Sequence, residues 1–261
     1  MPTDLTVTRL STTPVKGLAL HHPDSVELTP EGPVGDRLFF LVDDDGKIQS
    51  CTGNQGLYGL VATYDAASRR LTVSRGGQVL VDGAAEPGQP VDTDMWGTRL
   101  QPGHVVADPA FADFFSDAVG RRVRLVRADG SAFDVHPATL LGTASVDRLA
   151  RHARLPAVDG RRFRMLVEFS GGEPHVEDTW VGHRLEVGGA VLVGGGPVKR
   201  CAATTREPDT GEVDLQTLRM IMDYRGRQES DLGAGAMFGT YATVLEPGTV
   251  SVGDVLRVHA G

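Results

Sequence analysis

Cys201 lies in the part of this sequence that is richest in groups able to do chemistry. The segment GGGPVKRCAATTREPDTG, from Gly194 to Gly211, places its thiol after a glycine run and two cations and before several hydroxyls. Lys199 and Arg200 favour the thiolate, the form that acts as a nucleophile or as a ligand for a soft metal. Cysteine is also common as a small buried apolar residue, and the thiol alone favours that simpler interpretation.

Other candidates for metal or redox chemistry are few. The 261 residues include two cysteines, Cys51 and Cys201, which are far apart in the sequence. Two such thiols do not make a disulfide framework, a four-thiolate zinc site or an iron–sulfur ligand set. His136 and the other histidines show no metal-ligand spacing, and we assign them no role.

Charge and hydropathy restrict the partners of the chain. Its formal net charge is −8, and it has no long basic run, so we expect no nucleic-acid partner. No stretch approaches the roughly 20 apolar residues of a membrane-spanning helix, and the first residues do not resemble a signal peptide. We therefore expect a cytoplasmic protein without membrane contact.

The elements that must position these groups are mainly strands. The first hundred residues contain short strand-like runs bounded by Gly, Pro or Asp: LTVTRL from Leu5, SVELT from Ser25, LFFLVDD from Leu38, LYGLVATY from Leu57 and RLTVSR from Arg70. The stretch from Pro109 to Gly120 instead has phenylalanines at helical spacing, with Asp108 as a candidate N-cap. This half of the chain is predicted to be antiparallel sheet followed by one amphipathic helix.

The second half is predicted to contain two short helices among further strands. One helix starts after Ser145 and runs through His152, and the other runs from Asp214 to Tyr224. The strand candidates are FRMLVEF from Phe163, HRLEVGGAVLVGG from His183, TYATVLE from Thr240 and SVGDVLRVHA from Ser251. The last two are joined through PGTV, a turn signal, which predicts a terminal hairpin or barrel closure. A polar stretch near Arg127 is the best candidate boundary, giving domains 1–127 and 128–261.

The segment around Cys201 resembles the cysteine signature of MOSC domains, the family of the molybdenum cofactor sulfurase C-terminal domain and of the amidoxime-reducing enzymes. An Arg beside the Cys, paired threonines and a Pro-Asp-Thr-Gly turn occur in the family's order. Further matches follow the same order along the chain: TPVKG at 13–17, GDRLFFLVDDDG at 35–46, TASVDRL at 143–149, RFR at 162–164, EDTW at 177–180, and FGTY and PGTVSVGD near the end.

This resemblance implies a mostly β fold, with a MOSC β-barrel, an N-terminal β domain and a few short helices. It also implies a molybdenum cofactor, molybdopterin carrying Mo, in the cleft between the domains. That cofactor ends in a phosphate, so its site needs cations for the phosphate, donors and acceptors for the pterin and a soft anion for the metal.

The resemblance assigns a role to each matched residue. Cys201 is the metal ligand, and Lys16 and Arg37 lie near the phosphate. The other implied cofactor-binding residues are Gly17, Thr143, Ser145, Arg164, Arg200, Thr204 and Thr205. Taken singly, such residues are more often solvated charges or helix caps. Asp209 is a candidate catalytic residue that orients substrate or accepts a proton, and it is equally compatible with a turn residue in PDTG.

The sequence also departs from the amidoxime-reducing branch. A second cysteine of that branch is replaced by Val198, a Pro-Asn pair by Met165 and Leu166, and a Thr-x-Arg by the residues from Gln49 to Cys51. Some relatives carry an added ferredoxin domain, for which this sequence has no cysteines left over. The resemblance therefore implies a separate flavin, iron–sulfur or haem protein as electron donor.

The leading hypothesis is a molybdenum-cofactor-dependent oxidoreductase that reduces N-hydroxylated, or N-oxygenated, small molecules. A sulfur carrier that holds a persulfide on Cys201 is one alternative, because it needs the same thiolate. A non-catalytic protein that binds or carries the cofactor is another.

Overall fold

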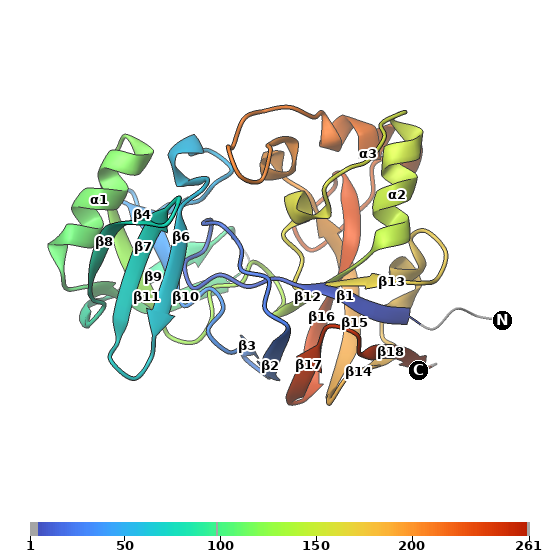
Figure 1. The fold of residues 1–261 in the computed structure, drawn as a ribbon, viewed down its shortest axis with the longest axis horizontal. Coiled ribbons are helices and arrows are strands. Elements are labelled where there is room, and N and C mark those ends of the chain that lie inside the picture. The colour runs from blue at the N-terminus through green and yellow to red at the C-terminus, as the bar shows by residue number, and fades with distance from the viewer. Residues whose placement is uncertain (1–4, 98, 260–261) are drawn as a thin grey trace.

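The computed structural model describes residues 5–97 and 99–259, and they form two lobes joined along one side (Figure 1). The larger lobe is a closed barrel with helices α2 and α3 beside it, and the other lobe combines smaller sheets with helix α1. The predicted fold class, mostly β with a barrel and a few short helices, is confirmed.

Seven strands close the barrel. In spatial order they are β1 (Leu5–Leu10), β13 (Val167–Ser170), β12 (Ala138–Gly142), β16 (Met237–Glu246), β15 (Ala190–Lys199), β14 (Arg184–Val187) and β18 (Val255–His259). Only β12 and β13 pair in parallel among these strands. Each strand contributes buried apolar side chains to one core, where the rings of Phe169 and Trp180 pack 5.0 Å apart. Burial of this core holds the strands in register.

The other lobe contains a five-stranded sheet in the order β5 (Ile48–Gln49), β4 (Phe39–Asp43), β11 (Val123–Ala128), β10 (Arg99–Val106) and β9 (Pro87–Met95). A three-stranded sheet of β6 (Val61–Asp65), β7 (Arg70–Arg75) and β8 (Gln78–Ala84) lies against it. Helix α1 (Pro109–Val119) packs Phe111 and Phe115 into the core that the two sheets share. A separate small sheet of β17 (Gly248–Ser251), β2 (Ser25–Thr29) and β3 (Gly32–Pro33) packs instead against the barrel core, through Val26, Leu28 and Val250.

The first helix has the capping that the sequence predicts. The Asp108 side chain accepts a hydrogen bond from the Ala110 amide at 3.0 Å, and Gly120 ends the helix in the left-handed conformation at φ 70°. Helix α2 (Thr143–His152) begins at the end of β12, and helix α3 (Thr217–Arg225) begins three residues later than predicted. The residues just before α3 are not helical, and the Asp214 carboxylate among them binds Arg162.

Of the two expectations for the C-terminal strands, a hairpin or a barrel closure, the structure shows the barrel closure. The predicted turn PGTV is itself largely strand β17, which pairs with β2, so β16 and β18 do not form a hairpin. Strand β18 instead pairs with β14 and β1, and it closes the barrel. Strand β1 is therefore part of the barrel although it lies far from the other barrel strands in the sequence. The division at residues 127 and 128 remains a prediction.

Short 3-10 helices complete the junctions: η1 (Gln55–Leu57), η2 (Gly160–Phe163), η3 (Val176–Trp180) and η4 (Ala202–Thr205). Helix η2 precedes β13, and η4 follows β15, so both extend barrel strands. These two turns also contribute to a pocket that both lobes line.

Candidate functional site

A pocket of about 610 Å³ is lined by residues from both lobes. The lining comes from segments far apart in the sequence: 16–17, 37, 48–54, 96, 133–139, 162–166, 198–204, 232 and 241. Among the described residues of this lining, six are Lys or Arg and one, Asp134, is a carboxylate. The pocket is thus locally cationic in a chain whose formal net charge is −8.

Cys201 is exposed at the wall of this pocket, directly after β15. It caps the start of η4 in an extended conformation, and its Sγ lies 3.4 Å from the Thr52 hydroxyl. The interpretation of Cys201 as a sealed apolar residue is wrong. The buried cysteine is Cys51, which packs with Tyr58 and Ala203.

The two threonines after Cys201 hold its turn together. The Thr204 hydroxyl donates to the Cys201 carbonyl at 3.0 Å and contacts the Thr217 hydroxyl at 2.7 Å. The Thr205 hydroxyl donates to the Ala202 carbonyl at 2.7 Å. Thr204 lines the pocket and Thr205 does not, so the structure gives Thr205 a local role only.

Lys16 brings its ammonium to the pocket from the segment before β4. The Nζ atom donates to the Ala132 carbonyl at 2.8 Å and to Asp134 at 2.6 Å. Burial lowers the pKa of Lys16, partly against the effect of that carboxylate. Burial would raise the pKa of Asp134, yet the Lys16 ammonium beside it holds the pKa at about 2. At neutral pH Asp134 is therefore a carboxylate.

Gly17, next to Lys16, lies where two pocket loops meet. Its φ is 91°, and a Cβ there would come within 3.1 Å of the Cys51 amide nitrogen. Both features favour glycine at this position. Gly17 is therefore explained by close backbone packing at the pocket wall.

Arg37 and Arg164 approach each other across the pocket. Arg37 is ion-paired with Asp36, and its Nη2 lies 3.5 Å from the Arg164 carbonyl. Arg164 has a left-handed backbone at φ 53°, which directs its side chain to the Leu18 carbonyl at 2.7 Å. A non-glycine residue in this conformation is uncommon and often marks a functional site.

Two lining arginines carry unsatisfied donors. Arg200 donates to the Phe163 carbonyl and lies 3.3 Å from the Met165 sulfur, and Arg162 binds Asp214. Within the part of the chain that the structure describes, the Nε atoms of both arginines are buried and have no hydrogen-bond partner. Burying an unsatisfied charged donor is costly, so an anionic ligand would stabilise this pocket. The donor set therefore fits a phosphate-bearing cofactor with a soft metal next to Cys201.

Thr143 and Ser145 are not in this pocket, contrary to their predicted role. Ser145 is fully buried, donates to Glu177 at 2.8 Å and accepts from the His175 amide at 2.8 Å. Thr143 instead lines a second cavity of about 430 Å³ that also contains Arg9 and Glu168. These residues belong to the first turn of α2, where Ser145 is held by buried hydrogen bonds rather than facing a ligand.

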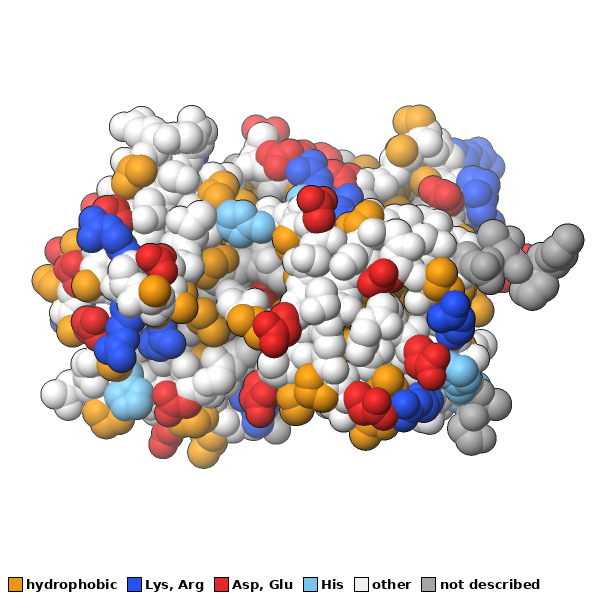
Figure 2. Space-filling model, turned by 60° about the horizontal axis from the view of Figure 1, so that its bottom comes forward, with side chains coloured by type: hydrophobic (Ala, Val, Ile, Leu, Met, Phe, Trp, Pro, Cys, Tyr) orange, Lys and Arg blue, Asp and Glu red, His pale blue; other side chains and the backbone are white. Residues whose placement is uncertain are grey.

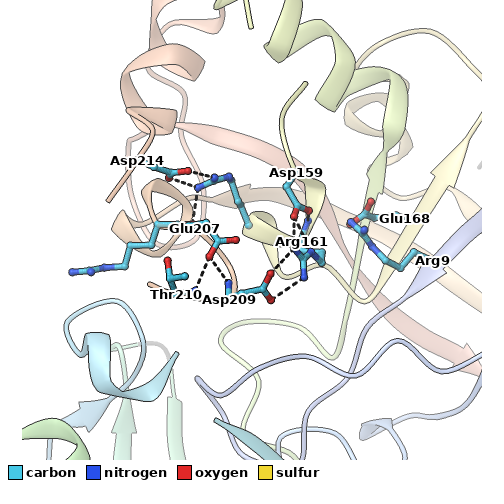
Figure 3. Close-up of polar contacts among 10 residues, drawn as sticks. Arg9, Asp159, Arg161, Glu168, Glu207, Asp209, Thr210 and Asp214 are labelled. Atoms are coloured by element: carbon cyan, nitrogen blue, oxygen red, sulfur yellow. Dashed lines mark hydrogen bonds and ion pairs between the residues drawn. The ribbon is translucent and has the colours of Figure 1, made fainter. Parts of the chain in front are cut away.

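Asp209 is also outside the pocket lining. Its two carboxylate oxygens accept hydrogen bonds from the Arg161 guanidinium at 3.0 Å each, and Arg161 also binds Asp159 (Figure 3). The Asp209 amide in turn donates to Glu207 at 2.8 Å. The structure thus supplies Asp209 with partners that suit a turn residue, and we omit it from the site.

The pocket contains residues that the sequence did not single out as functional. Trp96 donates its indole N–H to Asp134 at 2.7 Å, and His136 and Tyr241 form another part of the wall. These side chains carry no local signal, because only the fold brings their segments together. The residues that depart from the amidoxime-reducing branch all line the pocket as well: Gln49, Ser50, Cys51, Met165, Leu166 and Val198.

No helix in the described ranges is long and apolar enough to cross a membrane. The same residues contain no group of three or more His, Cys, Asp or Glu side chains placed to hold a metal ion. On the face seen in Figure 2, acidic and basic side chains are interspersed.

Two family models match this chain, the MOSC domain over residues 131–257 and the MOSC N-terminal beta barrel domain over residues 4–122. Mitochondrial amidoxime-reducing component 1 of Homo sapiens is 32% identical over 126 residues, 46% of this chain and 36% of that protein. Molybdenum cofactor sulfurase of Caenorhabditis briggsae is 28% identical over 97% of this chain and 36% of that protein. The matches thus span about a third of these relatives.

Among solved structures, the YuaD protein of Bacillus subtilis has a TM-score of 0.49 at 12% identity and covers 100% of this chain and 98% of that one. This likeness is too weak to support a conclusion. The family models and the two curated relatives do confirm the resemblance that the motifs indicate, and the chain belongs to the MOSC family.

Proposed function

We propose that the pocket binds a molybdenum cofactor with Cys201 as its protein ligand, and that the protein uses it to reduce N-hydroxylated small molecules. The observation that carries this proposal is the exposed Cys201 thiol in a pocket lined by six Lys and Arg side chains. Thiolates suit soft metals, and clustered cations suit a phosphate. Both requirements are met in one cavity.

Different residues of the pocket would bind different parts of the cofactor. Lys16 and Arg37 would hold the phosphate, and Arg200 and Arg164 would neutralise negative charge nearer the thiol. A single Arg–phosphate contact at about 4 Å gains on the order of 4 kcal/mol per unit charge at an effective dielectric of 20, before desolvation is subtracted. When bound, the cofactor supplies a centre that exchanges two electrons. The apolar Met165, Leu166 and Val198 would keep water from part of the wall.

The proposal includes two partners. One is a small N-oxygenated substrate, and the other is a separate electron-donor protein with a flavin, iron–sulfur or haem group. The curated relative named as an amidoxime-reducing component supports the reaction type. The cytoplasmic location remains a prediction.

A sulfur-carrier function is the second candidate, because the sulfurase match covers nearly the whole chain. An exposed thiol beside Arg200 and Thr52 would also stabilise a persulfide anion. Purified protein that carries a persulfide on Cys201 but contains neither molybdenum nor pterin would favour this candidate.

The experiment that tests the proposal is cofactor analysis of protein expressed with ample molybdate. The wild-type protein is expected to contain molybdenum and pterin and to oxidise reduced viologen when an N-hydroxylated substrate is added. As isolated, Cys201→Ser is expected to be inactive and to contain far less metal than the wild type, because its cofactor is held by the remaining contacts alone. Cys51→Ser, at the buried thiol of the same pocket, is expected to retain the metal. A Cys201→Ser protein with wild-type metal content and activity contradicts the proposal.

A further inference from the structure

His136 stands at the pocket wall in contact with two other titratable groups. It lies in the loop that leads into β12, and its side chain is 31% exposed. The Nε2 atom lies 3.6 Å from a carboxylate oxygen of Asp231, in the loop between α3 and β16. The ring packs edge to face against Tyr241 of β16, with centroids 5.4 Å apart. The fold thus joins a histidine–carboxylate pair to the pocket.

Tyr241 connects this pair to the cysteine side of the pocket. Tyr241 lines the same pocket as Arg200 and Cys201. The imidazole therefore contacts a residue that shares the pocket wall with Cys201. His136 is the one histidine that the described part of the chain contributes to the lining.

The other titratable groups of the lining are poorly suited to release a proton at neutral pH. Asp134 is already a carboxylate, since its pKa is about 2. Burial raises the pKa of Tyr241 far above neutrality, and arginines do not release their protons. The Lys16 ammonium is fixed to Asp134 and the Ala132 carbonyl, and that of Lys199 donates to the Leu232 carbonyl at 2.7 Å. An imidazole is the side chain that ordinarily exchanges a proton near pH 7.

We propose that His136, which lies beside Asp231, is the proton donor of the reduction. This inference rests on the proposed function and identifies a residue that the family motifs do not include. Reduction of an N-hydroxyl group breaks the N–O bond and uses two electrons and two protons, giving an N–H group and water. The electron-donor protein supplies the electrons through the cofactor. His136 protonates the leaving oxygen, and solvent supplies the second proton. Because the Asp231 side chain beside it is exposed, water can reprotonate His136.

Several charged or titratable groups lie around His136, and the experiment must separate their effects from that of the imidazole. Asp231 faces it from the α3–β16 loop, Tyr241 from β16, and Asp134 lies two residues away on its own loop. Lys199 of β15 contacts the same α3–β16 loop at Leu232. Asp231→Asn removes the carboxylate while preserving its size, so it tests the pairing separately from the imidazole.

The experiment compares His136→Gln and Asp231→Asn with the wild-type holoenzyme, using molybdenum content, kcat and KM across pH. General acids contribute roughly 10²–10⁴-fold, so His136→Gln is expected to lower kcat by about 100-fold with unchanged metal content and similar KM. The dependence of kcat on pH should also differ from that of the wild type. His104→Gln is the matched control, because His104 forms a similar pair with Asp129 at 3.4 Å outside the pocket lining.

A second readout does not need the loaded enzyme. Proton NMR of the cofactor-free protein follows the His136 ring, identified by its absence in His136→Gln, and Asp231→Asn is expected to shift the ring resonances because it changes the group beside the ring. Unchanged resonances would overturn the pairing. A His136→Gln enzyme with wild-type kcat and pH profile overturns the proton-donor inference alone, as does one that has lost its molybdenum. Wild-type protein without cofactor or turnover overturns the proposed function, and this inference with it.

Discussion

Two junctions between a barrel strand and a helix carry family motifs, yet only one of them presents its motif side chain to a pocket. At the end of β15, Cys201 opens into the cationic pocket. At the end of β12, Ser145 points into a sealed interior, where Glu177 and the His175 amide occupy its hydroxyl. The comparison teaches that a motif match identifies a family position, whereas burial and hydrogen-bond partners decide whether the side chain can reach a ligand.

The largest effect, on cofactor affinity, should come from removing a cation of the pocket that Cys201 faces. Lys16→Met removes the buried ammonium while keeping the length of the side chain, and we expect cofactor affinity to fall about 100-fold, or about 2.7 kcal/mol. Titration of cofactor-free protein with isolated cofactor measures it. Lys47→Met, at an exposed lysine, is the control and should bind normally. Equal affinities for Lys16→Met and wild type would remove the phosphate role from Lys16.

The buried junction after β12 should make the stability of the protein depend on pH. Burial and the Arg225 cation lower the pKa of His175 to about 4, from 6.5 in the unfolded chain, so His175 is neutral when folded. The stability that this provides is complete above pH 6.5 and is lost as pH falls from about 6.5 to about 4, because the unfolded state then binds the extra proton. The loss should reach about 2 kcal/mol after allowance for partial exposure.

Urea unfolding between pH 7 and pH 4.5 measures that loss. His175 has a φ of 66°, which asparagine tolerates, so His175→Asn should flatten the dependence on pH without backbone strain. His259→Asn, at an exposed histidine near Glu186, is the control and should keep the wild-type slope. If the unfolding free energy of His175→Asn depends on pH as steeply as that of the wild type, other groups cause the loss of stability in acid.

Ser145→Ala should affect stability and leave the cofactor in place. It removes the donor to Glu177 and the acceptor of the His175 amide, which are both buried, and should cost about 2 kcal/mol. Thermal unfolding and molybdenum content are the two measurements, with the exposed Ser68→Ala as control. Loss of cofactor from a Ser145→Ala protein of normal stability would restore Ser145 to the site.

Asp209→Asn should have the smallest effect. The Arg161–Asp209 pair is largely solvent-exposed on the Asp209 side, at 68%, and such pairs contribute about 0–1 kcal/mol. We expect unfolding free energy to change by less than about 1 kcal/mol, with kcat within about twofold of wild type. Steady-state kinetics checks this, and a tenfold lower kcat would mean that Asp209 is catalytic after all.

Local signals predicted some elements well. Helix α1 carries its own N-cap, apolar face and glycine stop, all within a dozen positions, so its bounds follow from the sequence. The sequence does not predict strands β8, β9 and β10, because most residues of β8 and β9 are exposed, β9 includes two prolines and β10 has no regular alternation of buried and exposed residues. Their pairing is determined by neighbouring strands, which no local pattern reveals.

The candidate site was predictable to the extent that it depends on family positions. Lys16, Arg37, Arg164 and Cys201 were assigned by motif, and the fold brings them to one pocket. His136 could not be identified, because its relation to Asp231 and Tyr241 arises only when three separate segments pack together. Ser145 was misassigned for the converse reason, since its occupying partner Glu177 is more than thirty positions away.

The direct test of the central claim is X-ray absorption at the molybdenum edge of wild-type and Cys201→Ser proteins, each reconstituted with cofactor. If the Cys201 thiolate binds the metal, the wild-type spectrum will show one more sulfur neighbour than the serine variant. An identical sulfur count in the two proteins would contradict the account.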